Sequence, residues 1–237
     1  MIACYDLHRR LPTYDFFNWL AHVRVFGATE ITFSMSSKLL MRKKWPHKET
    51  HDRLENYLLP GPALAGLPAR MGEDGDREIG SHLMADLWRD VQKAGIEMPR
   101  LRSVLPPINS QVRYTVTIRE TFWQMQKNSA PVWRKFANRI GARIIEDTAR
   151  VKIGLHERVA IYAGAEMNFG VPNGPFSMLW WTPYPMTMFC DPVLNGPDWK
   201  RQDTKVGGQV PWMLPNQRMV WAEATMDRLM EEFERIQ

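Results

Sequence analysis

The chain has 237 residues, a net charge of +5 at pH 7 and a hydrophobic share of 44%. This length allows one large domain or two small ones, and the composition excludes a disordered or fibrous protein. The sequence pI near 9.3 favours an anionic ligand or partner.

The two cysteines, Cys4 and Cys190, both lie in apolar stretches and are far apart in the sequence. We therefore expect two buried free thiols in a reducing compartment. The N-terminus lacks a secretion signal and no apolar run is long enough to span a membrane, so the sequence predicts a cytoplasmic protein. No Cys/His spacing typical of zinc is present, and we expect neither a metal ion nor another cofactor.

Residues 1–7 predict a buried strand, and residues 30–35 alternate like a second one. Between them, Thr13 is expected to cap a helix that Gly27 closes, with Asp15 in its first turn. The apolar face of this helix consists of Phe16, Phe17, Leu20 and Val23. A strand, a helix and a strand within about 35 residues form a βαβ unit, so the two strands should be parallel.

Asp6, His8 and Arg9 follow the first strand. Ligands of such sheets gather at the carboxyl ends of the strands, so these side chains mark a potential site. A carboxylate beside an imidazole suits general acid–base chemistry, which makes Asp6 or His8 the candidate base. The alternative is a polar surface loop.

Two further helices are expected over residues 47–59 and 79–94. Residues 60–75, rich in Gly and Pro, are expected to form a surface loop or a lid over a site. Arg42, Lys43 and Lys44 form a short basic run, which is a solvated loop or, in the alternative, a contact with nucleic acid.

Pro106 and Pro107 mark the expected boundary between an N-terminal half, residues 1–105, and a C-terminal half, residues 110–237. The second half continues with a strand over residues 112–118. A helix capped by Ser129 and closed by Gly141 follows, and then a strand over residues 142–146 that ends at Asp147.

The central stretch of the second half runs from Glu157 to Pro175. Val159, Tyr162, Ala163 and Met167 recur at helical spacing, and Gly170 is expected to end that helix. Asn173, Gly174 and Pro175 form a turn that opens a short apolar helix reaching Trp181. A glycine turn at a helix N-terminus favours an anion, and we expect a phosphate there.

Residues 186–190 predict another buried strand, and residues 191–214 a long polar segment. The chain should end with an amphipathic helix whose buried side consists of Val220, Met226, Leu229, Met230, Phe233 and Ile236. Together these patterns predict an α/β protein in two halves that both contain βαβ units.

Residues 111–221 resemble the carboxyl-terminal, nucleotide-sugar-binding half of GT-B glycosyltransferases, in their heptosyltransferase-like and fucosyltransferase-like branches. Three stretches carry the resemblance: TVTIRE from Thr115, ERVAIYAGAEMNFGVPNGP from Glu157, and GGQVPWMLPNQRMVW from Gly207. The likeness covers a little under half of the chain and implies an abbreviated GT-B fold. In such a fold two small Rossmann-like halves face each other across a cleft, and the C-terminal helix packs back onto the first half.

The resemblance implies that Arg119, at the end of its strand, grips the diphosphate of a nucleotide-sugar donor. It also implies that Asn173, Gly174 and Pro175 contact donor phosphate, with Ser177 just inside the helix. An Arg fork and a helix N-terminus can stabilise a departing diphosphate without a metal ion. The alternative for Arg119 is an ion pair with Glu120 or a neighbouring carboxylate, and the alternative for Asn173–Pro175 is a turn with no ligand.

The sequence leaves two possible roles each for Asp147 and Arg158, and one for His156. Asp147 at a strand end binds a ribose or base edge, or caps the next segment. Arg158 reaches the same anion, or forms a salt bridge on the helix surface. His156 is expected in a solvent-facing loop.

The first half is shorter than the acceptor half usual in GT-B enzymes, and a catalytic base is not unambiguous. One hypothesis is a glycosyltransferase that moves a sugar from a nucleoside diphosphate sugar to a glycan or other hydroxyl acceptor, with Asp6 or His8 as base. The other is a non-catalytic nucleotide- or glycan-binding or assembly protein on the same scaffold. Nucleic acid is not an expected partner.

Overall fold

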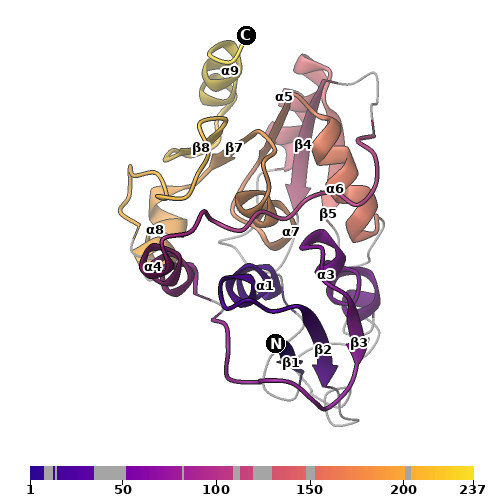
Figure 1. Cartoon of the computed structure of the whole chain (residues 1–237). Coiled ribbons are helices and arrows are strands. Elements are labelled where there is room, and N and C mark those ends of the chain that lie inside the picture. Colours follow the sequence, from indigo (N-terminus) through magenta and orange to yellow (C-terminus); the bar gives the residue numbers. More distant parts are fainter. Residues whose placement is uncertain are drawn as a thin grey trace, which may run out of the picture. The chain divides into compact units, whose positions relative to one another are not determined.

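The computed structural model divides into two compact units. Unit 1 consists of Met1–Leu105 with Ile153–Val159, and unit 2 of Pro106–Lys152 with Ala160–Gln237 (Figure 1). The structure describes residues 1–7, 13, 15–34, 52–81, 83–108, 113–119, 130–147, 153–200 and 204–237.

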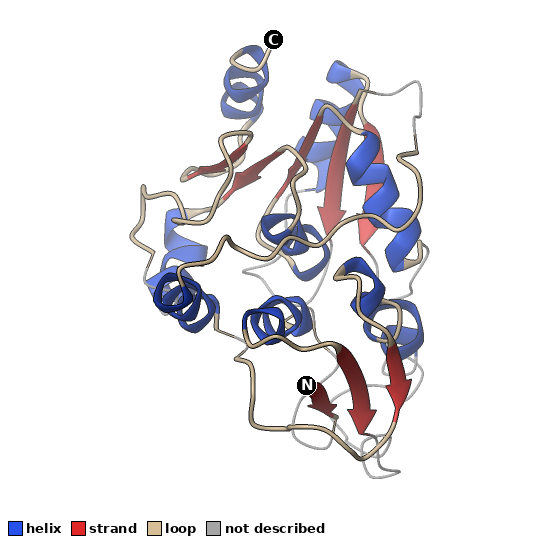
Figure 2. Cartoon of the chain, in the orientation of Figure 1, coloured by secondary structure: helices blue, strands red, loops and turns tan. Residues whose placement is uncertain are grey.

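Unit 1 is built on a parallel sheet with the strand order β1-β2-β3 (Figure 2). The strands are β1 (Ile2–Asp6), β2 (Glu30–Ser34) and β3 (Ala69–Met71), and helix α1 (Phe16–Val25) joins the first two. The predicted parallel βαβ unit is confirmed. The expected loop over residues 60–75 is wrong, since it contains β3 and the short helix α3 (Gly61–Leu64).

Helix α1 is enclosed on almost every side, as its nearly continuous apolar sequence requires. Tyr5 of β1 makes edge contacts with Phe16 and Trp19 of α1, with ring centroids 4.9 and 4.8 Å apart. Asp15 occupies the N-cap position and accepts a hydrogen bond from the Thr13 hydroxyl, so the predicted Thr13 cap is displaced by two residues. Gly27, at φ 77°, closes the helix as expected.

Two more helical segments complete unit 1. The π-helix η2 (Leu54–Leu58) lies within the predicted helix over residues 47–59, and α4 (Met84–Ala94) within the one over 79–94. Helix α4 packs against α1. His22 of α1 accepts the Ser81 backbone N–H at Nδ1 and contacts Asp90 of α4 through Nε2, which fixes the two helices to each other.

Unit 2 is a five-stranded parallel sheet with the order β5-β4-β6-β7-β8. Its first strand therefore lies between the second and the third, an order typical of doubly wound α/β proteins. The strands are β4 (Tyr114–Arg119), β5 (Arg143–Asp147), β6 (Met167–Gly170), β7 (Met186–Phe189) and β8 (Gln217–Val220). The helices are α5 (Ala130–Ile140), α6 (Leu155–Gly164), α7 (Gly174–Ser177), the 3-10 turn η4 (Met178–Trp181), α8 (Pro192–Lys200) and α9 (Met226–Glu234).

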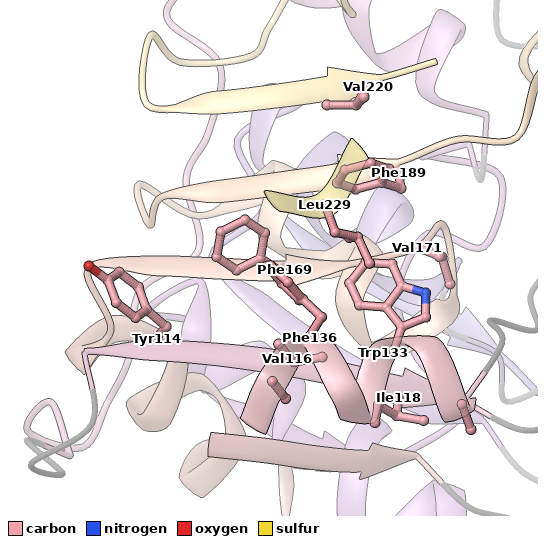
Figure 3. Packing of buried hydrophobic residues seen from close by; sticks show 12 residues of the cluster. Tyr114, Val116, Ile118, Trp133, Phe136, Phe169, Val171, Phe189, Val220 and Leu229 are labelled. Carbon is pink, nitrogen blue, oxygen red and sulfur yellow. The ribbon is translucent and has the colours of Figure 1, made fainter. Parts of the chain in front are cut away.

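One face of this sheet carries the main core of unit 2 (Figure 3). Trp133 and Phe136 of α5 pack there on the strand residues Val116 and Phe169, and Leu229 of α9 completes the layer. Helix α9 packs against α5 of the same unit. The expectation that the C-terminal helix ties the two halves together stays a prediction.

Several sequence-based boundaries in unit 2 are wrong. The helix expected to continue to Gly170 ends at Gly164, and Met167–Gly170 is strand β6. Val220, expected on the last helix, ends strand β8, and the polar segment 191–214 contains α8. Short apolar runs fit both a helix and a strand, and the pairing that selects the strand involves distant residues such as Val116 and Phe169.

Candidate anion site at the carboxyl edge of the second sheet

The topology of unit 2 creates a switch point between β4 and β6. From β4 the chain moves outward through α5 to β5, and then returns through α6 past β4 to β6. Because right-handed crossovers in opposite directions place their helices on opposite faces, the loops after β4 and β6 diverge. Ligands of open parallel sheets bind at this place, outside the carboxyl ends of the strands.

Arg119 is the last residue of β4 and therefore lies at this edge. The expected position at a strand end is thus confirmed. Arg119 is 7% exposed, so its guanidinium is largely withdrawn from bulk water. Alternation along the strand places Arg119 on the same face as Thr115 and Thr117, opposite the aromatic core. Glu120, the alternative ion-pair partner, lies outside the described residues.

Asp147 ends β5 and is the register partner of Arg119 in the neighbouring strand. The backbone thus brings these two predicted site residues to the same edge of the sheet. The Asp147 side chain lies outside the described part of the chain, and its expected contact with a ribose or base edge stays a prediction.

Asn173 follows β6 and begins α7. Its Oδ1 accepts the Phe176 backbone N–H at 3.0 Å, so Asn173 is the N-cap of the helix that the predicted turn opens. Gly174 and Pro175 then form the first turn, and Ser177 ends the helix with its backbone N–H bonded to the Asn173 carbonyl.

The capping leaves an unusual donor. Asn173 is 1% exposed, and its Nδ2 donates to no atom of the described residues. A buried amide without an acceptor costs about 1–3 kcal/mol, so such groups are rare unless something else accepts from them. Helix α7 is too short for a strong dipole, because the dipole grows with the number of aligned peptides. The side-chain amide is therefore the better-placed donor at this turn.

Tyr162 of α6 was not singled out as a site residue from the sequence, yet it lies between these elements. Its hydroxyl is 2.8 Å from the Thr117 Oγ1 atom, and its ring makes an edge contact with Phe176 of α7. The helical stripe in the sequence indicates that Tyr162 is buried, but it carries no information on which strand or turn the hydroxyl meets.

The candidate base is placed in unit 1. Asp6 ends β1 and is buried, with a carboxylate oxygen 3.8 Å from Arg77 Nη1. Arg77 also donates to Glu73, which accepts from the Ser34 hydroxyl at the end of β2. A polar cluster thus lies at the carboxyl edge of the first sheet. His8 and Arg9 lie outside the described residues, as do Arg42, Lys43 and Lys44.

Two expectations for α6 are corrected. His156 is not in a solvent-facing loop but in the first turn of α6, where Nε2 is 2.9 Å from the Pro60 carbonyl oxygen. Arg158 is 1% exposed, which excludes a salt bridge on the helix surface. The two cysteines are buried free thiols, as predicted.

Neither a membrane span nor a metal cluster is found in the described ranges. No described helix has the length and apolarity needed to cross a bilayer. The same residues contain no group of three or more His, Cys, Asp or Glu side chains placed to hold a metal ion.

Comparison with known proteins identifies the fold. No family model matches the sequence, and no curated protein does. Among solved structures, the iron-containing dodecameric glycosyltransferase TibC from enterotoxigenic E. coli H10407 superposes with a TM-score of 0.51 at 11% identity, over 99% of this chain and 76% of TibC. The E. coli heptosyltransferase WaaC with ADP gives 0.51 at 11% identity over the whole of both chains.

The chain has a GT-B-like fold. A second TibC structure, a heptosyltransferase in complex with ADP-D-beta-D-heptose, gives a TM-score of 0.50 at 12% identity over 93% of this chain and 63% of the other. The predicted α/β class with two Rossmann-like halves is confirmed by the two parallel sheets and by these GT-B-like neighbours. Identities this low concern the fold alone.

Proposed function

We propose that the protein is a glycosyltransferase that moves a sugar from a nucleoside diphosphate sugar to a hydroxyl acceptor. The observation that carries the proposal is the switch point of unit 2. There, a largely buried guanidinium ends β4, and a buried amide with no acceptor among the described residues follows β6, at the edge where open parallel sheets bind ligands. Both groups donate hydrogen bonds, and one carries a positive charge, so the edge suits an anion.

Each residue has a role in this proposal. Arg119 presents its planar fork to the donor diphosphate, and the Asn173 side chain and the Gly174 backbone N–H donate to phosphate oxygens. Pro175 and Ser177 shape the turn, with the Ser177 hydroxyl as a further donor. Asp147 contacts the ribose or the base.

In the transfer step the acceptor oxygen forms a bond to the anomeric carbon while the bond from that carbon to the diphosphate oxygen breaks. The bonding electrons leave with the diphosphate, where Arg119 and the N–H donors offset the growing negative charge. The hydroxyl proton passes to a base, for which Asp6 or His8 is the candidate. We place the protein in the cytoplasm, since both cysteines are free.

Thermal-shift measurements with UDP, GDP, CMP and ADP test the donor site. A nucleotide present at 100 times its Kd should stabilise the fold by about 2.7 kcal/mol, which raises the Tm by roughly 5–10 °C. Arg119→Ala should weaken binding about 10- to 100-fold, because a hydrogen bond to a charged group contributes about 1.5–3 kcal/mol. Arg113→Ala is the matched control, since Arg113 is 60% exposed and precedes the amino end of the same strand.

Turnover then separates an enzyme from a binder. Slow hydrolysis of the matching nucleotide sugar should persist in Arg113→Ala and fall in Arg119→Ala. Asp6→Asn should abolish transfer while leaving the nucleotide-induced shift intact. If none of the four nucleotides shifts the Tm, or if Arg119→Ala binds as tightly as the wild type, the donor site is refuted.

A non-catalytic nucleotide- or glycan-binding protein on the same scaffold is the second candidate. The burial of Asp6 and its proximity to Arg77 favour it, because a buried carboxylate near a guanidinium is poorly placed to take a proton from an incoming hydroxyl. Binding without hydrolysis or transfer would support this candidate.

A further inference from the structure

We infer that Tyr162 is a positioning residue that sets the spacing between the two donors of the anion site, Arg119 on β4 and Asn173 before α7. The inference rests on the proposed function. Tyr162 is fully buried on α6, on the face of the sheet opposite the aromatic core. It contacts Thr117 on β4 and Phe176 on α7.

The first contact fixes Tyr162 to β4. Its hydroxyl and the Thr117 hydroxyl are 2.8 Å apart, and both residues are fully buried. Thr117 precedes Arg119 by two residues on the same face of the strand, a distance of about 6–7 Å along the backbone. The bond thus fixes Thr117, and with it the carboxyl end of β4, relative to α6.

The second contact fixes Tyr162 to α7. The Tyr162 and Phe176 rings meet edge to face, with centroids 6.2 Å apart and planes at 87°. Phe176 is the residue whose backbone N–H is capped by Asn173, so its position determines where the Asn173 amide points. Gly170 allows this arrangement, because a Cβ there would come within 2.8 Å of the Phe176 ring.

The backbone of Tyr162 is itself restrained. Asn168 of β6 donates from Nδ2 to the Tyr162 carbonyl at 3.1 Å, and its Oδ1 accepts from the Thr115 hydroxyl at 2.6 Å. Tyr162 therefore cannot slide along the sheet to compensate for a change at either contact. Buried polar networks of this kind favour one geometry.

The test uses Tyr162→Phe, with inorganic pyrophosphate and the four nucleotides as ligands in calorimetric titrations. Losing the hydroxyl releases Thr117 from this bond, and affinity for pyrophosphate should fall about 3- to 10-fold, in line with the net effect of one hydrogen bond. Thr32→Val is the control. It removes a buried hydroxyl hydrogen bond from unit 1, where the Thr32 hydroxyl donates to the Asp74 carbonyl, and should lower stability without weakening binding.

The double variant Tyr162→Phe/Thr117→Val separates positioning from stability. Replacing both partners by apolar groups of similar shape should restore much of the stability, because neither hydroxyl is then left without the other. Affinity should stay low, since the bond that places Arg119 is still missing. In an Arg119→Ala background, Tyr162→Phe should have no further effect on binding.

Three results overturn the inference. They are unchanged affinity in Tyr162→Phe, recovery of affinity together with stability in the double variant, and failure of the wild type to bind pyrophosphate. Failure of the proposed function gives a different result: no nucleotide binds or reacts, whether or not pyrophosphate binds. If pyrophosphate binds in a way that depends on Arg119 and Tyr162, but none of the nucleotides binds, the positioning role stands and the transferase proposal falls.

Discussion

At the scale of single residues, Asn173 shows how one side chain can be half predictable. Asn173, Gly174 and Pro175 indicate a turn that opens a helix, and the structure adds that the Asn173 Oδ1 caps this helix by accepting the Phe176 N–H. The opposite end of the same amide is buried without an acceptor among the described residues, which no local pattern reveals. Burial depends on what packs over the turn, and that is supplied by distant parts of the chain.

Cys190 gives a prediction about pH. Burial raises the pKa of this thiol well above its ordinary value of 9.0. Below pH 9 both the folded and the unfolded chain keep the proton, and above it only the unfolded chain loses it, so stability falls as pH rises. The loss should be about 1.4 kcal/mol at pH 10.

Urea unfolding of the wild type and Cys190→Ala at pH 8, 9 and 10 measures this loss. The alanine variant pays a constant cost for the cavity, so the comparison concerns the slope of the free energy of unfolding with pH. Equal slopes for the two proteins would show that the native thiol ionises as easily as the unfolded one.

At the scale of elements, α6 and the segment that leads into β4 are joined more closely than the linker composition indicates. The Ile108 N–H donates to the Ala160 carbonyl at 3.0 Å, and Gly164 lies against the Ile108 backbone. The sequence indicated the apolar stripe of α6 and a Pro-rich linker. It gave no sign that the linker packs on the helix, because that contact joins residues more than fifty positions apart.

Gly164→Ala tests this packing. A Cβ at this position would lie 2.5 Å from the Ile108 carbonyl oxygen, and a backbone atom cannot turn aside as a side chain can. The overpacking should lower the free energy of unfolding by about 1–3 kcal/mol, despite the better helix propensity of alanine. Chemical denaturation gives the number.

Gly196→Ala in α8 is the control for the glycine exchange. Among the described residues its Cβ would meet only a Val206 methyl carbon, at 3.2 Å, and the variant should be as stable as the wild type or slightly more so. Equal stability of Gly164→Ala and the wild type would mean that the linker does not pack on α6 in solution.

At the scale of the whole molecule, each unit carries one buried cysteine, Cys4 in unit 1 and Cys190 in unit 2. Helix α6 belongs to both units, since Leu155–Val159 groups with the first and the remainder with the second. A helical segment of about five residues is not stable by itself. If either unit unfolds, its part of α6 should unfold too, and the remaining part is then too short to be stable as a helix.

Thiol labelling follows the two units separately. Neither cysteine should react with a disulfide reagent in the native protein, and in increasing urea both should become reactive at the same midpoint. The single variants Cys4→Ala and Cys190→Ala assign each signal to one thiol. Clearly separate midpoints would show that the units unfold independently and that α6 does not couple them.

The sequence by itself determined what is local: the βαβ unit at the N-terminus, the strand that ends at Arg119, the turn at Asn173 that opens a helix, and the glycines that close α1 and α5. These features depend on the periodicity and the φ preferences of neighbouring residues. The tertiary structure alone decided that Met167–Gly170 is a strand, that β4 lies between β5 and β6, and that Tyr162 touches both Thr117 and Phe176. Each of these joins residues far apart in the chain, and their free energy comes from burial and pairing that local periodicity does not encode.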